Sequence, residues 1–317
     1  MACAVGRTDP MRHLWVDGEG RLRLGWRLLA YVLVFALCGA GGSVLGHLLR
    51  TMLPRWLVGL AVLVVGGGTC ILGFRVLRVR MDRRPWSWLG LHRSLRTARA
   101  FLGGFTWGVF MLAALFCVEW RLGWIEPTWL ADHWRLSAVL GALFVAVAIG
   151  LLEELLLRGA FLQNLGERLP LWAATLGTGV VFGLLHLANP AQHVDVAFVA
   201  SAALATLMLV LSRFVTGTLG WAIGWHAAWD WMQDVLGIAS LGAAKDHQVV
   251  SVVQHGPVAW TGQTPSIEGG GLAIAVVLLA VVVMWVRGRD IVWRAPLERG
   301  EARRETRIAA AVVPSST

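Results

Sequence analysis

Long apolar runs alternate with short polar connections along most of the chain. About eight runs approach the roughly 20 residues that an α-helix needs to cross the hydrocarbon core of a bilayer. Runs that contain glycine or end at proline have the least distinct boundaries. The runs cover residues 26–48, 56–77, 100–118, 136–162, 171–188, 194–211, 218–236 and 271–286. The pattern predicts an all-α fold, namely a polytopic transmembrane helical bundle with about eight spans.

Composition supports a membrane environment. Hydrophobic residues make up 57% of the 317 residues, and charged residues only 15%. A soluble protein of this length cannot bury so much apolar surface, so lipid must act as the solvent. We therefore expect an integral membrane protein that contacts membrane lipids.

The distribution of charge predicts which loops face the cytoplasm. Residues 75–99 contain eight arginines and one acid, Asp82, and the tail after Arg287 is also rich in arginine. Cytoplasmic loops carry such an excess of basic residues. The connection 119–135 contains acidic residues and several tryptophans. Tryptophans are common at the membrane interface, so this connection is expected on the face opposite the cytoplasm. Both termini are then cytoplasmic, and the arginine-rich, nearly lysine-free chain favours a bacterial cytoplasmic membrane.

The net charge of +9 is explained by this topology and by attraction to anionic lipid. No motif that reads nucleic acid accompanies it, so we expect no nucleic-acid partner. The sequence indicates no oligomeric state. The expected organisation has five parts: a cytoplasmic N-terminal segment (1–25), N-terminal spans with a basic cytoplasmic loop (26–135), a transmembrane core (136–237), an extracytoplasmic loop (238–270), and a last span with a basic cytoplasmic tail (271–317).

Two adjacent glutamates, Glu153 and Glu154, lie inside a predicted span. Carboxylates at membrane depth are costly, so they indicate a functional site. Helical spacing stacks Glu154 against Arg158 one turn later, whereas Glu153 projects about 100° away. Because it lacks this partner, Glu153 is the better candidate for a general base.

His186 is expected at a similar depth in the next span. Residues 166–170 turn the chain back, so Glu153 and His186 differ in depth by only about 3 Å at a rise of roughly 1.5 Å per residue. An antiparallel helix pair can then bring the two together. A water molecule held between Glu153 and His186 could be deprotonated there.

His226 and Asp230 share one face of a later span, because four residues separate them. Two hydrogen-bond donors on one face can stabilise a developing oxyanion. Asp230 can donate only when protonated; otherwise it would orient His226 or the water. Imidazole and carboxylate also bind zinc, so a divalent metal such as zinc at Glu153, His186 and His226 is an alternative, although no HExxH spacing supports it and no cofactor is certain.

These residues also resemble the motifs of a known family. Glu153-Glu-Leu-Leu-Leu-Arg158 resembles the EExxxR motif of the CPBP intramembrane proteases, which include the type II CAAX prenyl endopeptidases and bacterial homologues. Phe182-Gly-Leu-Leu-His186 resembles their FxxxH motif. His226-Ala-Ala-Trp-Asp230 resembles HxxxN or HxxxD. The three motifs occur in the family's order, and the resemblance covers roughly residues 136–237.

The resemblance implies a membrane endopeptidase. Members of the family have been described both as metalloproteases and as metal-independent glutamate proteases. The resemblance implies hydrolysis of a peptide bond in a membrane-associated or lipidated protein or peptide. Asp230 stands where asparagine is common in the family. The implied roles are water activation by Glu153 with His186, oxyanion support by His226 and Asp230, and support of the site by Glu154, Arg158, Phe182 and Asn189.

Two other classes of function remain open at this point. One is a non-catalytic membrane protein of the same fold, such as an immunity or scaffolding factor. The other is a transporter, because buried ionisable residues also line transport paths. No inverted repeat of the kind found in many transporters is visible in the sequence. The substrate is equally open, since a prenylated protein, a bacteriocin-like precursor and a membrane protein all fit.

Overall fold

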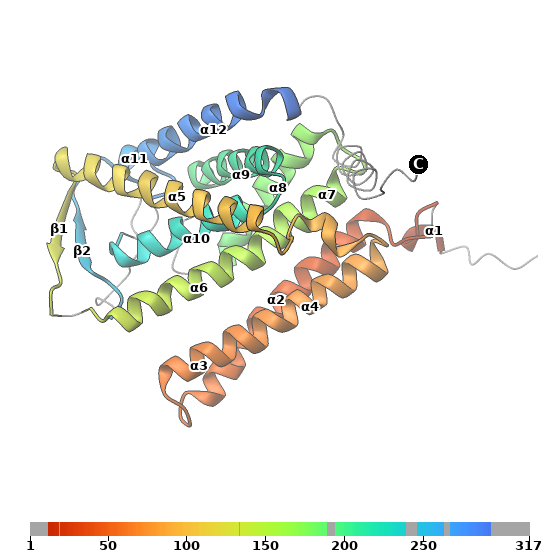
Figure 1. The fold of residues 1–317 in the computed structure, drawn as a ribbon, viewed down its shortest axis with the longest axis horizontal. Coiled ribbons are helices and arrows are strands. Elements are labelled where there is room, and N and C mark those ends of the chain that lie inside the picture. Colours follow the sequence, from red (N-terminus) through yellow and green to blue (C-terminus); the bar gives the residue numbers. More distant parts are fainter. Residues whose placement is uncertain are drawn as a thin grey trace, which may run out of the picture. The chain divides into compact units, whose positions relative to one another are not determined.

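The computed structural model describes residues 12–18, 20–132, 134–188, 194–238, 246–262 and 267–292. The chain divides into two compact units, Met1–Trp86 and Ser87–Thr317, and both are helical (Figure 1). In the described part, seven helices are long and apolar enough to cross a membrane. They are Leu24–Leu49, Leu57–Met81, Leu95–Arg121, Leu136–Leu165, Leu171–Ala188, Val196–Thr216 and Gly271–Gly288. The prediction of an all-α polytopic membrane bundle is confirmed.

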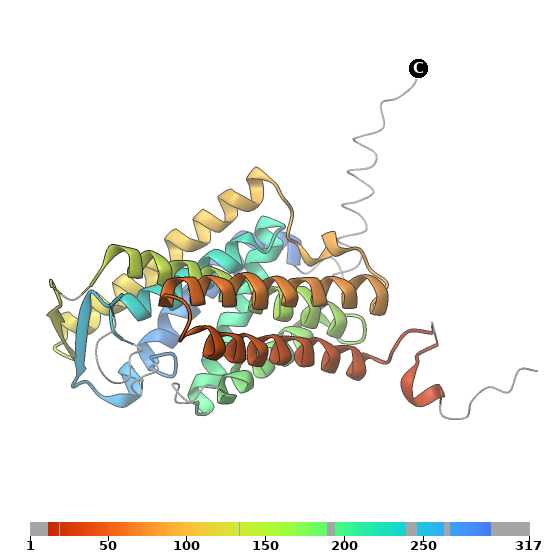
Figure 2. The same cartoon turned by 90° about the horizontal axis from the view of Figure 1, so that it is seen from below.

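The first unit is a helical hairpin. Short α1 (Arg12–Trp15) precedes α2 (Leu24–Leu49), which lies antiparallel to a second rod (Figure 2). This rod is continuous through α3 (Arg55–Ala61), the π-helical η1 (Val62–Gly67), α4 (Gly68–Val76) and the π-helical η2 (Leu77–Met81).

A buried polar cluster closes one end of the hairpin. Asp82 follows η2 and is fully buried, with its carboxylate 3.3 Å from Arg78 and 3.7 Å from Arg27. The hydroxyl of Tyr31 donates to the same carboxylate at 2.8 Å. Asp82, the single acid of the predicted basic loop, therefore neutralises charge inside the unit.

The second unit carries the motifs. Its segments are η3 (Trp86–Leu89, which begins at the unit boundary), α5 (Leu95–Arg121), α6 (Leu136–Glu154), the π-helical η4 (Leu155–Phe161), α7 (Leu162–Leu165), α8 (Leu171–Leu185), the 3-10 turn η5 (His186–Ala188), α9 (Val196–Thr216), α10 (Gly220–Val235), α11 (Val258–Thr261) and α12 (Gly271–Val292). The π-helical segment continues α6 directly into α7, so the glutamates and Arg158 lie on one uninterrupted rod.

The predicted span 218–236, which is not among these seven helices, corresponds to α10, a helix of 16 residues buried among the others. Gly220 packs against Thr97, and Gly224 packs against Phe101, so α10 and α5 run parallel from the same end of the unit. Sixteen residues extend only about 24 Å, less than the roughly 30 Å of hydrocarbon. Because neighbouring helices surround it, α10 can cross the unit at this length.

A two-stranded sheet joins the two connections that were expected on one face. Strand β1 (Ile125–Trp129) pairs antiparallel with β2 (Val250–Gln254), with Ile125 opposite Gln254. It lies beyond the ends of α5 and α10 and the start of α6 (Figure 1). Both connections therefore belong to the same end of the second unit, here called the sheet face.

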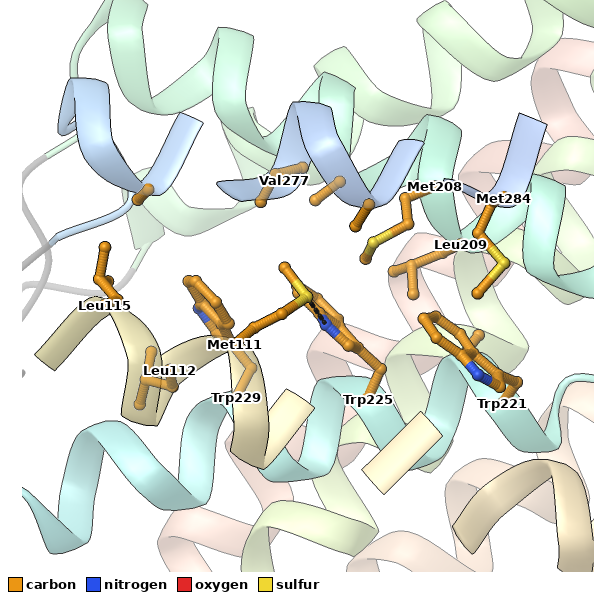
Figure 3. Close-up of a cluster of buried hydrophobic side chains, with 14 of the residues drawn as sticks. Met111, Leu112, Leu115, Met208, Leu209, Trp221, Trp225, Trp229, Val277 and Met284 are labelled. Atoms are coloured by element: carbon orange, nitrogen blue, oxygen red, sulfur yellow. Dashed lines mark hydrogen bonds between the residues drawn. The ribbon is translucent and has the colours of Figure 1, made fainter. Parts of the chain in front are cut away.

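Apolar side chains from α5, α9, α10 and α12 form the core of the second unit (Figure 3). Tryptophans at every fourth position of α10 point into it. Trp225 and Trp229 stack with ring centroids 5.0 Å apart, and the indole of Trp225 donates to the sulfur of Met111 at 3.3 Å. The tryptophans of this helix thus serve packing, as their helical spacing suggests.

The contact between α5 and α10 requires glycine at specific positions. A Cβ atom at Gly104 would overlap the backbone carbonyl of Trp221, whereas one at Gly103 would lie 3.8 Å from the Trp221 ring, an ordinary contact. We expect Gly104→Ala to destabilise the protein by about 1–3 kcal/mol through overpacking. Gly103→Ala, the matched control, should leave stability within about 0.5 kcal/mol. Denaturant unfolding of both variants in detergent measures the difference, and equal stability would contradict the close approach.

Candidate active site

A buried ion pair lies at the centre of the candidate site. Glu154 ends α6, Arg158 lies one turn later in η4, and both side chains are 0% exposed. The Nη1 atom of Arg158 donates to Oε1 of Glu154 at 2.8 Å. This is the pair that helical spacing predicts. A partner is needed because an unpaired charge in a lipid-surrounded interior costs several kcal/mol.

Two further helices complete the surroundings of Arg158. Its Nη2 atom donates to the hydroxyl of Thr206 on α9 at 2.7 Å. The guanidinium carbon also lies 4.8 Å from the ring centroid of Phe182 on α8, a cation–π distance. The predicted supporting residue Phe182 therefore contacts the ion pair.

The backbone of η4 receives its own support. Arg213 on α9 donates to the carbonyl of Arg158 at 2.6 Å and to the carbonyl of Trp88 at 2.8 Å. Gln163 donates to the Trp88 carbonyl as well, at 2.6 Å. In a π-helix the hydrogen bonds shift to the fifth residue. A buried arginine thus supplies a donor where the regular α-helical pattern is interrupted.

His226 on α10 lies among three carboxylates. Its Nδ1 atom is 3.0 Å from Oε1 of Glu154, and its Nε2 atom is 3.6 Å from carboxylate oxygens of both Glu153 and Asp230. The two adjacent glutamates approach the imidazole at different ring nitrogens. Their side chains differ in accessibility, because Glu153 is 21% exposed while Glu154 is fully buried.

His186 is held by its own helix. Its Nδ1 atom is 2.8 Å from the carbonyl oxygen of Phe182. A carbonyl can only accept, so Nδ1 carries a proton, and the tautomer that this contact selects has its lone pair on Nε2. The rings of Phe182 and Phe198 lie 4.7 Å and 5.3 Å from the imidazole. His186 is thereby fixed in one tautomer and one orientation.

A cavity of about 60 Å³ brings the second and third motifs together. His186, His226 and Asp230 all line it, together with aromatic and apolar side chains of α8, α9 and α10. A water molecule needs roughly 10–15 Å³ of such volume and two or more polar partners, so the cavity can hold several waters.

One carboxylate in this cavity has no counterpart in the motifs. Glu268 lies just before α12 and lines the cavity with Asp230. Its Oε1 atom accepts from Gln233 at 2.9 Å and from Trp229 at 3.4 Å. Thr206, Arg213 and Glu268 are among the residues at this site that the sequence did not indicate. Asn189, which it did indicate, lies outside the described residues.

The expected meeting of Glu153 with His186 takes a different form. Within the described structure, the ionic contact of Glu153 is with His226 rather than with His186. The depth argument concerned only the helices that carry Glu153 and His186. It could not place α10. His226 of this helix lies near Glu153, and its ring centroid is 5.8 Å from that of Phe182.

The donors do not form a preassembled metal centre. Among the described residues, no group of three or more His, Cys, Asp or Glu side chains could hold a metal ion. Nδ1 of His186 faces a carbonyl and Nδ1 of His226 faces Glu154, which is also how metal-ligating histidines are commonly held. A divalent metal at Glu153, His186 and His226 therefore stays a prediction.

The two adjacent glutamates should respond differently to the same substitution. Glu154→Gln leaves the Arg158 guanidinium buried without a counter-charge, so we expect a loss of about 3–5 kcal/mol in unfolding free energy. Glu153→Gln should change it by about 1 kcal/mol or less, because that side chain keeps partial exposure and is not a member of the buried ion pair. Denaturant unfolding in detergent tests this, and similar losses for the two variants would contradict the assignment.

Comparison with known proteins agrees with the motifs. Residues 135–232 match the model of the family described as type II CAAX prenyl endopeptidase Rce1-like. This segment runs from the start of α6 into α10 and includes all three motifs. No curated protein matches the chain. The chain thus carries an Rce1-like type II CAAX prenyl endopeptidase domain, and this domain places it among the membrane proteases.

Proposed function

We propose that the protein is an intramembrane endopeptidase that hydrolyses a peptide bond of a membrane-associated or lipidated protein or peptide with a water activated by glutamate and histidine. The observation that supports this most strongly is the shared cavity of His186, His226 and Asp230, residues of two motifs on different helices. Glu153 of the first motif lies beside them, 3.6 Å from His226.

Water activation falls to Glu153 and His186 in this proposal. His186 accepts a hydrogen bond from the water at Nε2, the ring atom left with a lone pair by the Nδ1 contact. Glu153 takes the proton as the water oxygen attacks the peptide carbonyl carbon. The same carboxylic acid then donates the proton to the leaving amine when the C–N bond breaks. The reaction needs no other proton donor.

Oxyanion stabilisation falls to His226 and Asp230. Glu154 accepts the Nδ1 proton of His226, so a protonated ring directs its Nε2 proton toward Glu153, Asp230 and the cavity. Asp230 supplies a second donor when its carboxyl is protonated. Backbone amides in a helix are already used, so side chains must provide such donors.

A peptide-cleavage assay tests the proposal. The purified protein is incubated in detergent with membrane peptides, some carrying a prenylated CAAX terminus and some unmodified. We expect Glu153→Gln and His186→Ala each to lower kcat by about a hundredfold or more. Glu126→Gln, the same chemical change at an exposed position of β1, should cleave as wild type does.

Each outcome of this assay is informative. Equal cleavage by wild type and Glu153→Gln would contradict the assigned base. Failure of every form to cleave any peptide would mean either that the substrate is absent from this set of peptides or that the protein is not a peptidase. Cleavage that continues in the presence of a chelator agrees with the arrangement of the histidine and carboxylate side chains. If the chelator abolishes cleavage and added zinc restores it, substrate binding assembles a metal site.

Asp230 has a separate test because an asparagine side chain can donate but cannot carry charge. If Asp230 acts as a donor to the oxyanion, Asp230→Asn should keep kcat within about threefold, while Asp230→Leu should lower it by roughly a hundredfold. If Asp230 acts as an ionised group or a metal ligand, both variants should lose activity. Steady-state kinetics on a cleaved peptide separates the two roles.

We further propose that the membrane is a bacterial cytoplasmic membrane and that both termini are cytoplasmic. The sheet face is then extracytoplasmic. The end of the second unit opposite the sheet face carries Arg96 and Arg99 at the start of α5 and Arg287 near the end of α12. Cytoplasmic loops carry an excess of basic residues, so these arginines support this orientation.

A further inference from the structure

A second cavity of about 440 Å³ lies toward the other end of α12 from the candidate active site. Helices α5, α9, α10 and α12 line it. Its rim carries three arginines, Arg96, Arg99 and Arg287, and no acidic side chain is among its described lining residues. Arginines from two helices that are far apart in sequence thus converge on one opening.

Charge around this cavity favours an anion. Arg96 and Arg99 lie in the first two turns of α5, where the amide groups of a long helix add partial positive charge. Arg287 approaches from α12. All three side chains belong to residues that are exposed rather than paired inside the protein. Guanidinium groups bind phosphate through two parallel hydrogen bonds, which makes phosphate the matching anion.

The interior of the cavity is apolar, in contrast to its rim. Gly103, Trp107 and Val283 line it below the arginines. From Arg99 to Trp107 the helix rises by about 12 Å, so the apolar lining reaches well into the hydrocarbon layer. Arginine at a membrane interface can simply extend toward water. Such arginines alone do not account for a hollow of this size with an apolar floor.

We propose that this cavity binds one anionic phospholipid, with its phosphate between the three arginines and an acyl chain along Gly103, Trp107 and Val283. The missing side chain at Gly103 leaves room for the acyl chain, because a Cβ there would meet only the Trp221 ring, at 3.8 Å or more. This site is separate from the proposed proteolytic chemistry and does not depend on it.

Native mass spectrometry of the full chain in neutral detergent, titrated with phosphatidylglycerol or phosphatidylcholine, tests the proposal. We expect preferential retention of phosphatidylglycerol by wild type. The combined variant Arg96→Gln, Arg99→Gln and Arg287→Gln should bind it at least tenfold more weakly. The matched control Arg75→Gln, Arg80→Gln and Arg93→Gln removes the same charge from exposed positions outside the cavity, so it should change binding less than twofold.

A second variant tests the acyl-chain part of the site. Gly103→Leu fills the floor without changing charge, so it should weaken phosphatidylglycerol binding while phosphate binding stays as in wild type. Equal weakening by the two triple variants would show only general charge attraction and would overturn the proposal. Displacement of the lipid by inorganic phosphate at a concentration similar to that of the lipid would also overturn the proposal. Because binding is the readout, loss of peptidase activity has no bearing on these outcomes.

Discussion

The second unit depends on one constraint, the need to satisfy a fully buried carboxylate far from water. Glu154 achieves this with Arg158 on its own rod and with His226 on α10. Arg158 in turn requires an acceptor on α9 and lies over an aromatic ring on α8. Four helices are therefore oriented by one ion pair. Removal of Glu154 or Arg158 leaves the other charge buried and uncompensated, which costs more than the pair itself contributes.

The same constraint explains why two glutamates stand next to each other. A single carboxylate cannot both neutralise a buried arginine and accept protons from a substrate-bound water. Helical geometry separates the tasks, because consecutive residues point about 100° apart. Glu154 faces the interior of the unit, and Glu153 retains partial exposure beside His226. Glu153 is thus available as the proposed base because Glu154 neutralises Arg158 and also contacts the imidazole of His226.

The sequence predicted the features that depend on periodicity. Apolar runs of membrane length identified the helices, and four-residue spacing paired Glu154 with Arg158 and placed His226 with Asp230. It could not identify Thr206 or Arg213, because single polar residues in an apolar helix carry no signal of the partner they meet in space. Nor could it show that a short α10 lies inside the unit, since burial depends on its neighbours. The contact of Glu153 with His226 follows from that burial.

The arrangement of the helices also determines where the candidate active-site cavity lies along the second unit. His186 directly follows α8, and Glu268 shortly precedes α12. The chain reaches α12 from β2 through α11, so this end of α12 belongs to the sheet face. Non-helical backbone at membrane depth is tolerated where protein buries it or where it lines a water-filled space. His186 and Asp230 therefore lie toward the sheet-face ends of α8 and α10, while the arginine-rimmed cavity lies toward the opposite end of α12.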